Sequence, residues 1–366
     1  MVGCYVHVPF CARRCGYCDF NTAVLGTGLT PDGWLAGLRA EIELVAPRER
    51  LGTVFFGGGT PTLLGGPILA DAMDMLRTEF GLASASEVTI EANPETVTEP
   101  LLDSLLAAGF TRLSLGMQSA DPAVLAVLDR AHTPGQATWC VGAARRAGFT
   151  NISLDLIYGA PGETLASWQH TLETALAAAP EHISCYALIV EPGTPLARRI
   201  DRGELPTPDD DLAADQYLLA DDLLTEADLD WYELSNWATP GHECRHNLGY
   251  WHSADWHGFG PGAHSHIGSQ RWWNHRSPRR WATALQRGES PVAGRELLDD
   301  TMIHEERLLL ELRLATGLAL AELSAAERER LPTFISNALL VTNTHHAVLT
   351  RQGRLLADKV VRDLLG

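Results

Sequence analysis

The sequence contains no apolar run that approaches the ~20 residues a helix needs to cross a bilayer. Its 366 residues are 45% hydrophobic and 20% charged, an ordinary globular composition with enough chain for one large domain and a smaller one. We therefore expect a soluble cytoplasmic protein, with peripheral membrane contact left open. Because a strand-like run begins at Val2, we also expect no signal or transit peptide ahead of the fold.

Positive charge is scarce. The chain has 28 Lys and Arg against 46 Asp and Glu, which gives a formal net charge of −18. Such a surface repels phosphates, so nucleic acid is not expected as a partner. The acidic excess is greatest over 201–230, where eleven Asp or Glu accompany the single Arg202. We interpret this largely helical stretch as a solvated helix face rather than a docking site for a basic partner.

A second C-x2-C pair, which a structural zinc site normally has, is also missing. The seven cysteines are an odd number, which fits a reducing compartment better than a disulfide framework. Three of them form C-x3-C-x2-C on one short loop: Cys11, Cys15 and Cys18. Thiolates select zinc, copper or iron–sulfur clusters. Zinc would need a fourth ligand, for which Cys4 is the nearby candidate, whereas a 4Fe–4S cluster on three thiolates keeps one iron open. We predict the cluster.

The residues around this loop carry a resemblance. Residues 5–20 read Y-V-H-V-P-F-C-A-R-R-C-G-Y-C-D-F. C-x3-C-x2-C with an aromatic residue before the third cysteine resembles the signature of radical S-adenosylmethionine (SAM) enzymes. The longer Y-x-H-x-P-F-C-x3-C-x-Y-C is similar to the HemN/HemW branch, oxygen-independent coproporphyrinogen oxidases and haem chaperones. The resemblance implies a SAM-coordinated 4Fe–4S cluster and an electron donor of the flavodoxin or ferredoxin type.

Six short apolar strands alternate with helices in the first half of the chain. The predicted strands cover 2–8, 53–56, 87–92, 111–116, 151–157 and 182–188. The predicted helices cover 31–46, 67–79, 99–108, 122–147 and 163–178. This alternation predicts a parallel sheet with right-handed helical crossovers. Polar signatures sit at the C-terminal ends of the strands, where barrel active sites gather. We therefore predict an α/β fold with a partial (β/α)6 TIM-like barrel, which the resemblance also implies.

The rest of the chain differs in composition. We assign 1–230 to the barrel core, 231–290 to a Trp/His-rich segment that covers the barrel opening, and 291–366 to a smaller C-terminal α+β domain that is winged-helix-like. In this last part we expect helices over 303–315 and 319–330, a strand from His346, a turn at Gln352-Gly353 and a final helix. Its nine Lys or Arg against eleven Asp or Glu argue against the DNA-binding use of that fold.

A glycine-rich turn, Gly57-Gly58-Gly59-Thr60-Pro61, follows the second predicted strand. Glycines allow close backbone approach, and the Thr hydroxyl supplies a hydrogen bond. A glycine triplet alone suits an ordinary structural turn equally well. This turn lies one βα unit after the cysteine loop, and in that position it resembles the family's G-G-G-T-P element. The resemblance therefore assigns Gly58, Gly59 and Thr60 to SAM.

Further polar residues stand in or beside the apolar strands. An unpaired carboxylate or amide is costly there, so each is either a satisfied structural group or part of a binding site. The resemblance assigns these residues to the SAM site: Glu91, Gln118, Arg130 and Asp155. Tyr5 and Tyr17 flank the cysteines and by the same matching contact SAM near the cluster, although simple packing of the loop would explain them as well. We assign no catalytic residue, because the chemistry belongs to the cofactor.

The H-N-x-x-Y-W element of HemW proteins, which is linked there with haem, is matched by residues 246–251. Haem takes an axial ligand, commonly imidazole, and flat apolar surface. The resemblance thus assigns His246, Tyr250 and Trp251 to haem, unless the segment only packs over the barrel. The axial ligand stays open among His246 and these neighbours: Cys244, His252, His257, His264 and His266.

Two differences separate this chain from the coproporphyrinogen oxidases. They carry a fourth cysteine two residues after the third and an N-terminal extension, whereas this chain has Phe20 and four residues before Tyr5. We therefore expect a haem chaperone that delivers haem to apo-haemoproteins of the respiratory chain. The alternative is an oxygen-independent coproporphyrinogen III oxidase. Whether SAM is cleaved and whether the protein forms a homodimer stay open.

Overall fold

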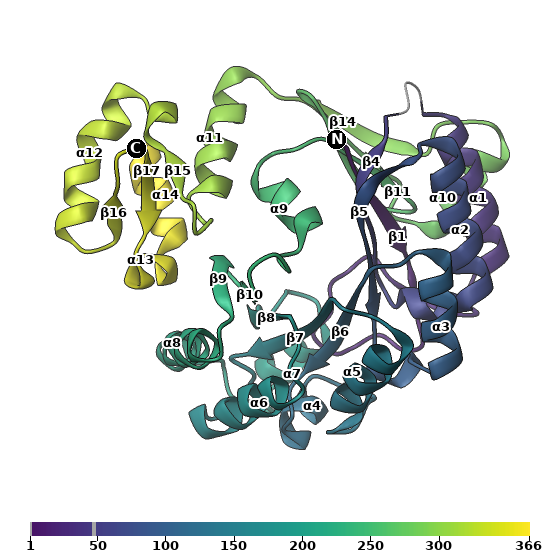
Figure 1. Ribbon diagram of the computed structural model, residues 1–366, viewed down its shortest axis with the longest axis horizontal. Helices are drawn as coiled ribbons and strands as arrows, with labels where there is room; N and C mark the ends of the chain where they lie inside the picture. The colour runs from purple at the N-terminus through teal and green to yellow at the C-terminus, as the bar shows by residue number, and fades with distance from the viewer. Residues whose placement is uncertain (1, 46–48) are drawn as a thin grey trace.

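The computed structural model describes residues 2–45 and 49–366, which are organised around a curved twelve-stranded sheet (Figure 1). The strand order is β14-β13-β12-β11-β1-β4-β5-β6-β7-β8-β10-β9. Its centre is a run of parallel strands: β1 (Val2–Val8), β4 (Leu51–Gly58), β5 (Leu82–Ala92), β6 (Arg112–Gln118), β7 (Ile152–Tyr158) and β8 (His182–Ala187). The six predicted strands and their parallel order are confirmed.

Helices follow these strands and cover the convex face of the sheet (Figure 1). They are α1 (Pro31–Glu43), α2 (Gly65–Glu79), α3 (Glu99–Ala108), α4 (Pro122–Val127), α5 (Gln136–Ala147) and α6 (Leu165–Ala177). Thr30, Thr98 and Thr164 cap the N-termini of α1, α3 and α6 by accepting a backbone N–H. The helices predicted over 122–147 are confirmed as α4 and α5, which are separated by a break that ends at Gly135, whose φ is +85°. The predicted end of α1 at residue 46 lies outside the described residues.

Tryptophans fix the outer helices to the sheet. Trp34 of α1 is fully buried, and its indole donates to the backbone oxygen of His7 at 3.0 Å. Trp168 of α6 is buried likewise and donates to the backbone of Gln216 in α8 (Asp210–Glu226) at 2.8 Å. Because a buried indole costs free energy unless its N–H is bonded, both bonds specify how the helices pack.

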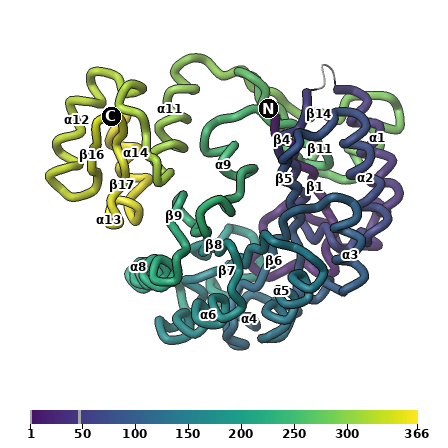
Figure 2. The backbone as a smooth tube through the Cα atoms, in the orientation of Figure 1, coloured from purple at the N-terminus to yellow at the C-terminus, as the bar shows by residue number. Residues whose placement is uncertain are grey.

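The segment 231–290 extends the sheet at both edges. At one edge β9 (Asp230–Glu233) and β10 (Asn236–Ala238) continue antiparallel from β8. At the other edge β11 (Trp256–Phe259) pairs parallel with β1, followed by β12 (His264–Ile267), β13 (Gln270–Asn274) and β14 (Val292–Leu297). Between the two edges α9 (Arg245–Trp251) packs against β4 (Figure 2). The helix α10 (Pro278–Gln286) lies beside α1 (Figure 1). These strands were not predicted.

The C-terminal part has a hydrophobic core of its own. It consists of α11 (Asp300–Glu311), β15 (Leu318–Ala319), α12 (Ala325–Ser336), β16 (Leu340–Thr342), β17 (His346–Leu349), α13 (Arg351–Leu355) and α14 (Ala357–Leu365). Its strands form a separate sheet in the order β15-β17-β16. The helix predicted from 319 is wrong at its start, since Leu318 and Ala319 pair with β17 and the helix begins after the capping box at Ser324.

Gly353 was predicted in a turn but lies within α13. A side chain there would collide with the backbone oxygen of Leu339, so this glycine is needed for close packing and not for a turn.

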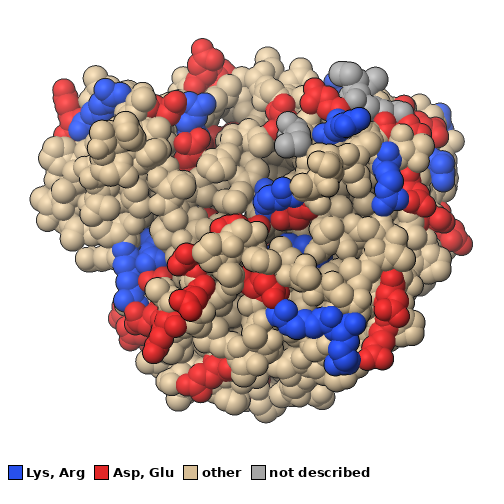
Figure 3. Space-filling model, viewed as in Figure 1, with Lys and Arg blue, Asp and Glu red and all other residues tan. Residues whose placement is uncertain are grey.

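The acidic stretch 201–230 begins at the last residue of α7 (Pro195–Asp201) and contains α8, over which acidic side chains gather at the lower left of Figure 3. Asp210, Asp211 and Asp215 are exposed, as predicted for a solvated face, but Asp221 is buried. Among the helices of residues 2–45 and 49–366, none combines the length and apolarity that a membrane crossing needs.

Candidate cluster, cofactor and haem site

The cysteine loop follows β1 at the C-terminal edge of the parallel strands. β2 (Phe10–Cys11) pairs with β3 (Ala23–Val24) and so closes the loop at its base. Cys11, Cys15 and Cys18 are partly exposed, unpaired, and line one cavity of about 560 Å³, which we call the cluster cavity. Burial raises the pKa of the Cys11 and Cys18 thiols, a penalty that a bound cationic metal centre would remove.

The donor set fits a multi-iron cluster. Cys4, the candidate fourth ligand for zinc, lies in β1, is 0% exposed in the hydrophobic core and does not line the cluster cavity. Across residues 2–45 and 49–366, no three Cys, His, Asp or Glu side chains converge closely enough to hold a single metal ion. Three thiols spread along a cavity wall instead suit a cluster whose separate irons each take one sulfur.

The glycine turn after β4 lies directly against the cysteine loop. Gly59 donates its N–H to Val8 at 2.8 Å, and Thr60 donates its N–H to Phe10 at 2.7 Å. Gly58 has a φ of +112°, and a side chain at Gly58 or Gly59 would collide with His7 or with the backbone of Phe10. Glycine is therefore required by the backbone here, and the turn places Gly58, Gly59 and Thr60 in the cavity wall.

Arg130 connects three parts of this wall. One guanidinium nitrogen donates to Asn93 at 2.6 Å and to the backbone oxygen of Gly116 at 3.0 Å, and the other lies 3.6 Å from the sulfur of Cys15. Asn93 in turn donates to the Thr60 hydroxyl at 2.9 Å. The sequence analysis missed Asn93, although an amide two residues after Glu91 at the end of a strand was a signal for it.

Two carboxylates lie in the same wall. Glu91 accepts a hydrogen bond from the N–H of Gly58 at 3.0 Å, and burial together with the charge of Asp155 raises the pKa of Glu91 to about 7. Asp155 accepts hydrogen bonds from Ser114 at 2.8 Å and from Ser184 at 2.9 Å. A cation placed between Glu91 and Asp155 would lower both pKa values, because it favours the ionised forms.

Gln118 ends β6 with a φ of +63°, a strained conformation for a residue with a side chain. Gly116 leaves room for its amide, since a side chain on Gly116 would lie 2.7 Å from the Gln118 nitrogen. Gln118 and Tyr17 also line the cluster cavity. The structure thus brings together every predicted cluster and SAM residue except Tyr5.

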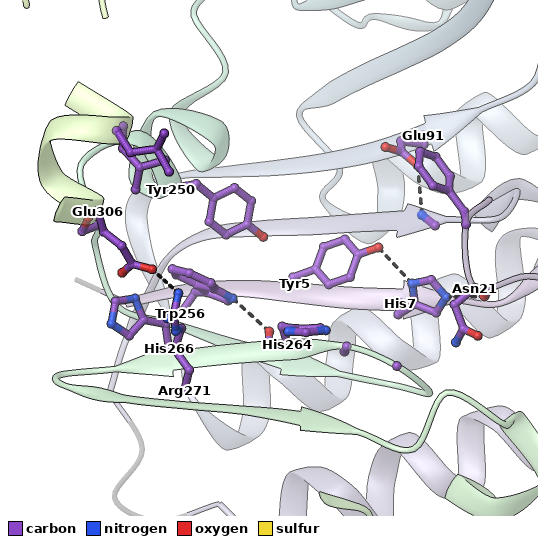
Figure 4. Close-up of a pocket in the computed structure, with 17 residues that line it drawn as sticks. Tyr5, His7, Asn21, Glu91, Tyr250, Trp256, His264, His266, Arg271 and Glu306 are labelled. Atoms are coloured by element: carbon purple, nitrogen blue, oxygen red, sulfur yellow. Dashed lines mark hydrogen bonds and ion pairs between the residues drawn. The ribbon is translucent and has the colours of Figure 1, made fainter. Parts of the chain in front are cut away.

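Tyr5 lies in a second cavity of about 600 Å³, which we call the aromatic cavity (Figure 4). It is lined by Tyr5, His7, Phe20, Asn21, Gly58, Glu91, Tyr250, Ser253, Trp256, Gly262, Ala263, His264, His266, Arg271, Glu306, Leu309 and Leu310. Phe20, Gly58 and Glu91 line the cluster cavity as well, so the two cavities adjoin. The Tyr5 hydroxyl is 3.0 Å from Nδ1 of His7.

The H-N-x-x-Y-W residues, 246–251, all lie within α9. Tyr250 lines the aromatic cavity, and its hydroxyl is 2.8 Å from Nε2 of His246. The other ring nitrogen of His246 is 2.8 Å from the Thr53 hydroxyl, and the ring is 2% exposed. Burial lowers the pKa of His246 to about 3, so the imidazole is neutral. Ligation of iron by His246 itself would break one of these bonds, and Trp251 is not among the residues that line the cavity.

The alternative axial ligands are dispersed. His264 and His266 line the aromatic cavity. His257 lines another cavity beside Glu41, and His252 is exposed. Cys244 is fully buried next to Glu87, outside the aromatic cavity.

Comparison with known proteins agrees with this site. A sequence profile described as "Radical SAM superfamily" matches residues 5–175. The chain is 52% identical over 370 residues to "Heme chaperone HemW" of Mycobacterium tuberculosis H37Rv, covering 100% of this chain and 95% of the relative. This chain belongs to the HemW family. The Bacillus subtilis HemW is 34% identical over 378 residues and 100% of both chains. Membership of the radical SAM superfamily confirms a 4Fe–4S cluster and SAM as cofactors.

The HemW fold is shared with a solved oxidase. The structure titled "Coproporphyrinogen III oxidase (HemN) from Escherichia coli is a Radical SAM enzyme" superposes with a TM-score of 0.86, covering 99% of this chain and 89% of that one. At 24% identity this likeness concerns the fold, and it confirms the predicted radical SAM barrel.

Proposed function

We propose that this HemW-family protein is a haem chaperone, which holds haem beside a SAM-coordinated 4Fe–4S cluster and delivers it to apo-haemoproteins of the respiratory chain. The observation that carries the proposal is the aromatic cavity. Its volume of about 600 Å³ lies within the ~300–1,000 Å³ of typical ligand pockets, and Tyr250, Trp256 and Leu310 give it apolar walls. The HemW relatives, named as haem chaperones, support the same function.

Within this function the cluster cavity holds the cofactors. Cys11, Cys15 and Cys18 bind three irons and leave the fourth to SAM. The glycine turn and Arg130 receive the amino-acid end of SAM, and Glu91, Gln118 and Asp155 face its cationic and polar groups. When bound, the cluster supplies an electron to SAM, while the chain positions SAM and excludes water. Tyr17 closes this cavity, and Tyr5 belongs to its border with the aromatic cavity.

Haem would lie against the segment after Cys244. Tyr250 contributes to the cavity wall directly, His246 acts behind it, and Trp251 supports α9 from outside the cavity. Phe20 is 63% exposed and borders both cavities, so haem would meet an apolar ring where the oxidases carry a cysteine.

The partners follow from the surface around the cluster loop. Arg13 and Arg14 are exposed between the first two cluster cysteines, on a protein with a net charge of −18. A small acidic electron donor of the flavodoxin or ferredoxin type would be attracted to these two arginines and repelled by the acidic remainder of the surface. The proposed site of action is the cytoplasm, with membrane contact and a homodimer left open.

The test is a transfer assay. Anaerobically reconstituted protein is loaded with haem and mixed with a haem-free respiratory cytochrome, with apomyoglobin as a generic acceptor. We expect one haem per chain and faster transfer to the cytochrome than free haem gives. A parallel incubation with coproporphyrinogen III, SAM and reductant tests the oxidase alternative. Porphyrin turnover without haem binding would replace the chaperone function with the oxidase.

A further inference from the structure

We propose that Tyr250 is the axial ligand that this protein offers to ferric haem, and that His246 positions the Tyr250 hydroxyl. The inference rests on the proposed haem-binding function and goes beyond it, because it names the ligating atom. Tyrosine is one of the side chains that hold haem iron in proteins.

His246 and Tyr250 are in direct contact within α9. His246 and Tyr250 are four residues apart, so they share one face of α9. The imidazole stands edge-on to the phenol at 4.9 Å between ring centres and stacks on Phe55 at 5.2 Å. His246 therefore cannot turn toward the cavity without losing both contacts. Tyr250 lines the cavity, and Figure 4 shows its hydroxyl end turned toward Tyr5.

Thr53 makes this pair suited to a phenolate. A Thr hydroxyl can donate or accept, so His246 can hold its proton on either ring nitrogen. Without haem, Nδ1 donates to Thr53 and Nε2 accepts from the phenol. A Tyr250 oxygen on Fe(III) would give up the phenol proton, and the other tautomer of His246 would then donate from Nε2 to the phenolate and accept from Thr53 at Nδ1. One proton leaves to water for each Fe–O bond formed, and the iron keeps its oxidation state.

Tyr5 lacks this freedom, although it also pairs with a histidine. Nε2 of His7 is 2.8 Å from the backbone oxygen of Asn21, which can only accept. The proton of His7 therefore stays on Nε2, and Nδ1 can only accept from the Tyr5 hydroxyl. A phenolate at Tyr5 would therefore face the lone pair on Nδ1 of His7 and would receive no hydrogen bond from it.

The histidines of the cavity are weaker candidates. Nε2 of His266 has no hydrogen-bond partner, but the atom itself is buried, and the ring stands edge-on to Trp256 at 5.1 Å. That nitrogen is therefore inaccessible in this arrangement of the side chains. His264 is exposed, and its ring stacks on Trp273 at 5.8 Å.

A ferric tyrosine ligand suits a protein that must give haem away. A phenolate is a hard anionic ligand that prefers Fe(III), so reduction of the iron weakens the bond. Neutral imidazole binds both oxidation states and would not make release depend on reduction. A tyrosine ligand would therefore make haem release sensitive to reduction of the iron.

The experiment titrates ferric haem into full-length reconstituted protein and records absorbance, resonance Raman and EPR spectra. The wild type should show a phenolate-to-iron charge-transfer band and an Fe–O(phenolate) stretching mode. Tyr250→Phe should lose both. His246→Ala should keep them with a shifted stretching frequency, and should bind ferric haem ~10–100-fold more weakly, as is usual when a group behind a metal ligand is removed.

The matched control is Tyr232→Phe. Tyr232 forms another buried pair, 2.7 Å from Nε2 of His182, and lines neither the cluster cavity nor the aromatic cavity. Its loss should leave the haem spectrum unchanged, and cluster content verifies the fold of every variant. Three results would overturn Tyr250 as the axial ligand and leave haem binding intact. They are an unchanged spectrum in Tyr250→Phe, loss of the phenolate signature in Tyr5→Phe, and loss of an imidazole signature in His266→Ala. A wild type that binds no haem overturns the proposed function as well.

Discussion

Arg130 lies 3.6 Å from the sulfur of Cys15 and so connects the segment after β6 to the cysteine loop. The same guanidinium donates to Asn93 and to the backbone of Gly116, while Asn93 donates to Thr60. One side chain thus joins the loop that binds the cluster, the turn that receives SAM and the ends of two strands. These positions depend on one another, so a change at Arg130 should affect SAM binding before it affects the fold.

We therefore expect Arg130→Met to weaken SAM binding while the barrel stays folded. The substitution removes the cation that receives the amino-acid end of SAM, which should weaken SAM binding by about 1–3 kcal/mol. Isothermal titration of SAM into reconstituted protein measures the loss. Arg146→Met is the matched control, because Arg146 forms an exposed ion pair with Glu99, and such pairs contribute about 0–1 kcal/mol. Equal SAM affinity in both variants would contradict a role for Arg130 in the site.

The cluster gives a second prediction. Anaerobic reconstitution should yield ~4 irons per chain, as expected for a 4Fe–4S cluster on three thiolates. Cys11→Ala, Cys15→Ala and Cys18→Ala should each abolish it. Cys140→Ala is the control, because Cys140 is buried in α5 and lines neither cavity. Stoichiometric zinc without iron in the wild type would restore the zinc alternative.

The barrel and the cofactor wall were predictable from the sequence for a physical reason. Each parallel strand is a short apolar run between turns, and polar residues directly after such runs meet at one edge of the sheet. Cys15, Glu91 and Asp155 could therefore be placed together although 140 positions separate the first from the last. Tyr5 lines the adjoining aromatic cavity, which shares Gly58 and Glu91 with the cluster cavity, so its contact with SAM stays a prediction.

The haem side could not be derived in the same way. β11, β12 and β13 are short strands rich in Trp and His, and they join the central sheet through the pairing of β11 with β1, which depends on contacts distant in sequence. The partner of His246 in β4, Thr53, has no local signal either. A motif names His246 and Tyr250, but which of them faces the cavity is a tertiary property.

The pH dependence of SAM binding should follow Glu91, whose pKa is raised to about 7 by burial and by the charge of Asp155. In the free protein an acid with a raised pKa favours the fold at low pH, and this stabilisation is lost as the pH rises through 7. SAM is cationic and prefers the ionised carboxylate. Its affinity should therefore be about tenfold weaker at pH 6 than at pH 8, since one pKa unit corresponds to ~1.4 kcal/mol. Calorimetry at the two pH values measures this.

Glu91→Gln is the control for that profile. The amide keeps the size of the side chain and removes its titration, so SAM affinity should be low and nearly the same at both pH values. A profile in Glu91→Gln as steep as in the wild type would assign the pH dependence to another group.

The last prediction concerns the attachment of the C-terminal part to the barrel. Arg354 of α13 donates to both oxygens of Asp221 in α8, at 2.9 and 2.7 Å, and its guanidinium stacks on Trp231 at 4.3 Å. Asp221→Ala leaves Arg354 buried without its counter-charge, which should lower the free energy of unfolding by ~3–5 kcal/mol.

The control is Asp222→Ala at the next position. It removes a carboxylate that is 62% exposed and should lower the free energy of unfolding by only ~0–1 kcal/mol. Urea unfolding followed by tryptophan fluorescence compares the two. Because the C-terminal part has its own core but no Trp, its release should appear first, as a change in the fluorescence of Trp231 beside Arg354, and the barrel should unfold later. Equal midpoints for the two variants would mean that apolar contacts alone hold the parts together.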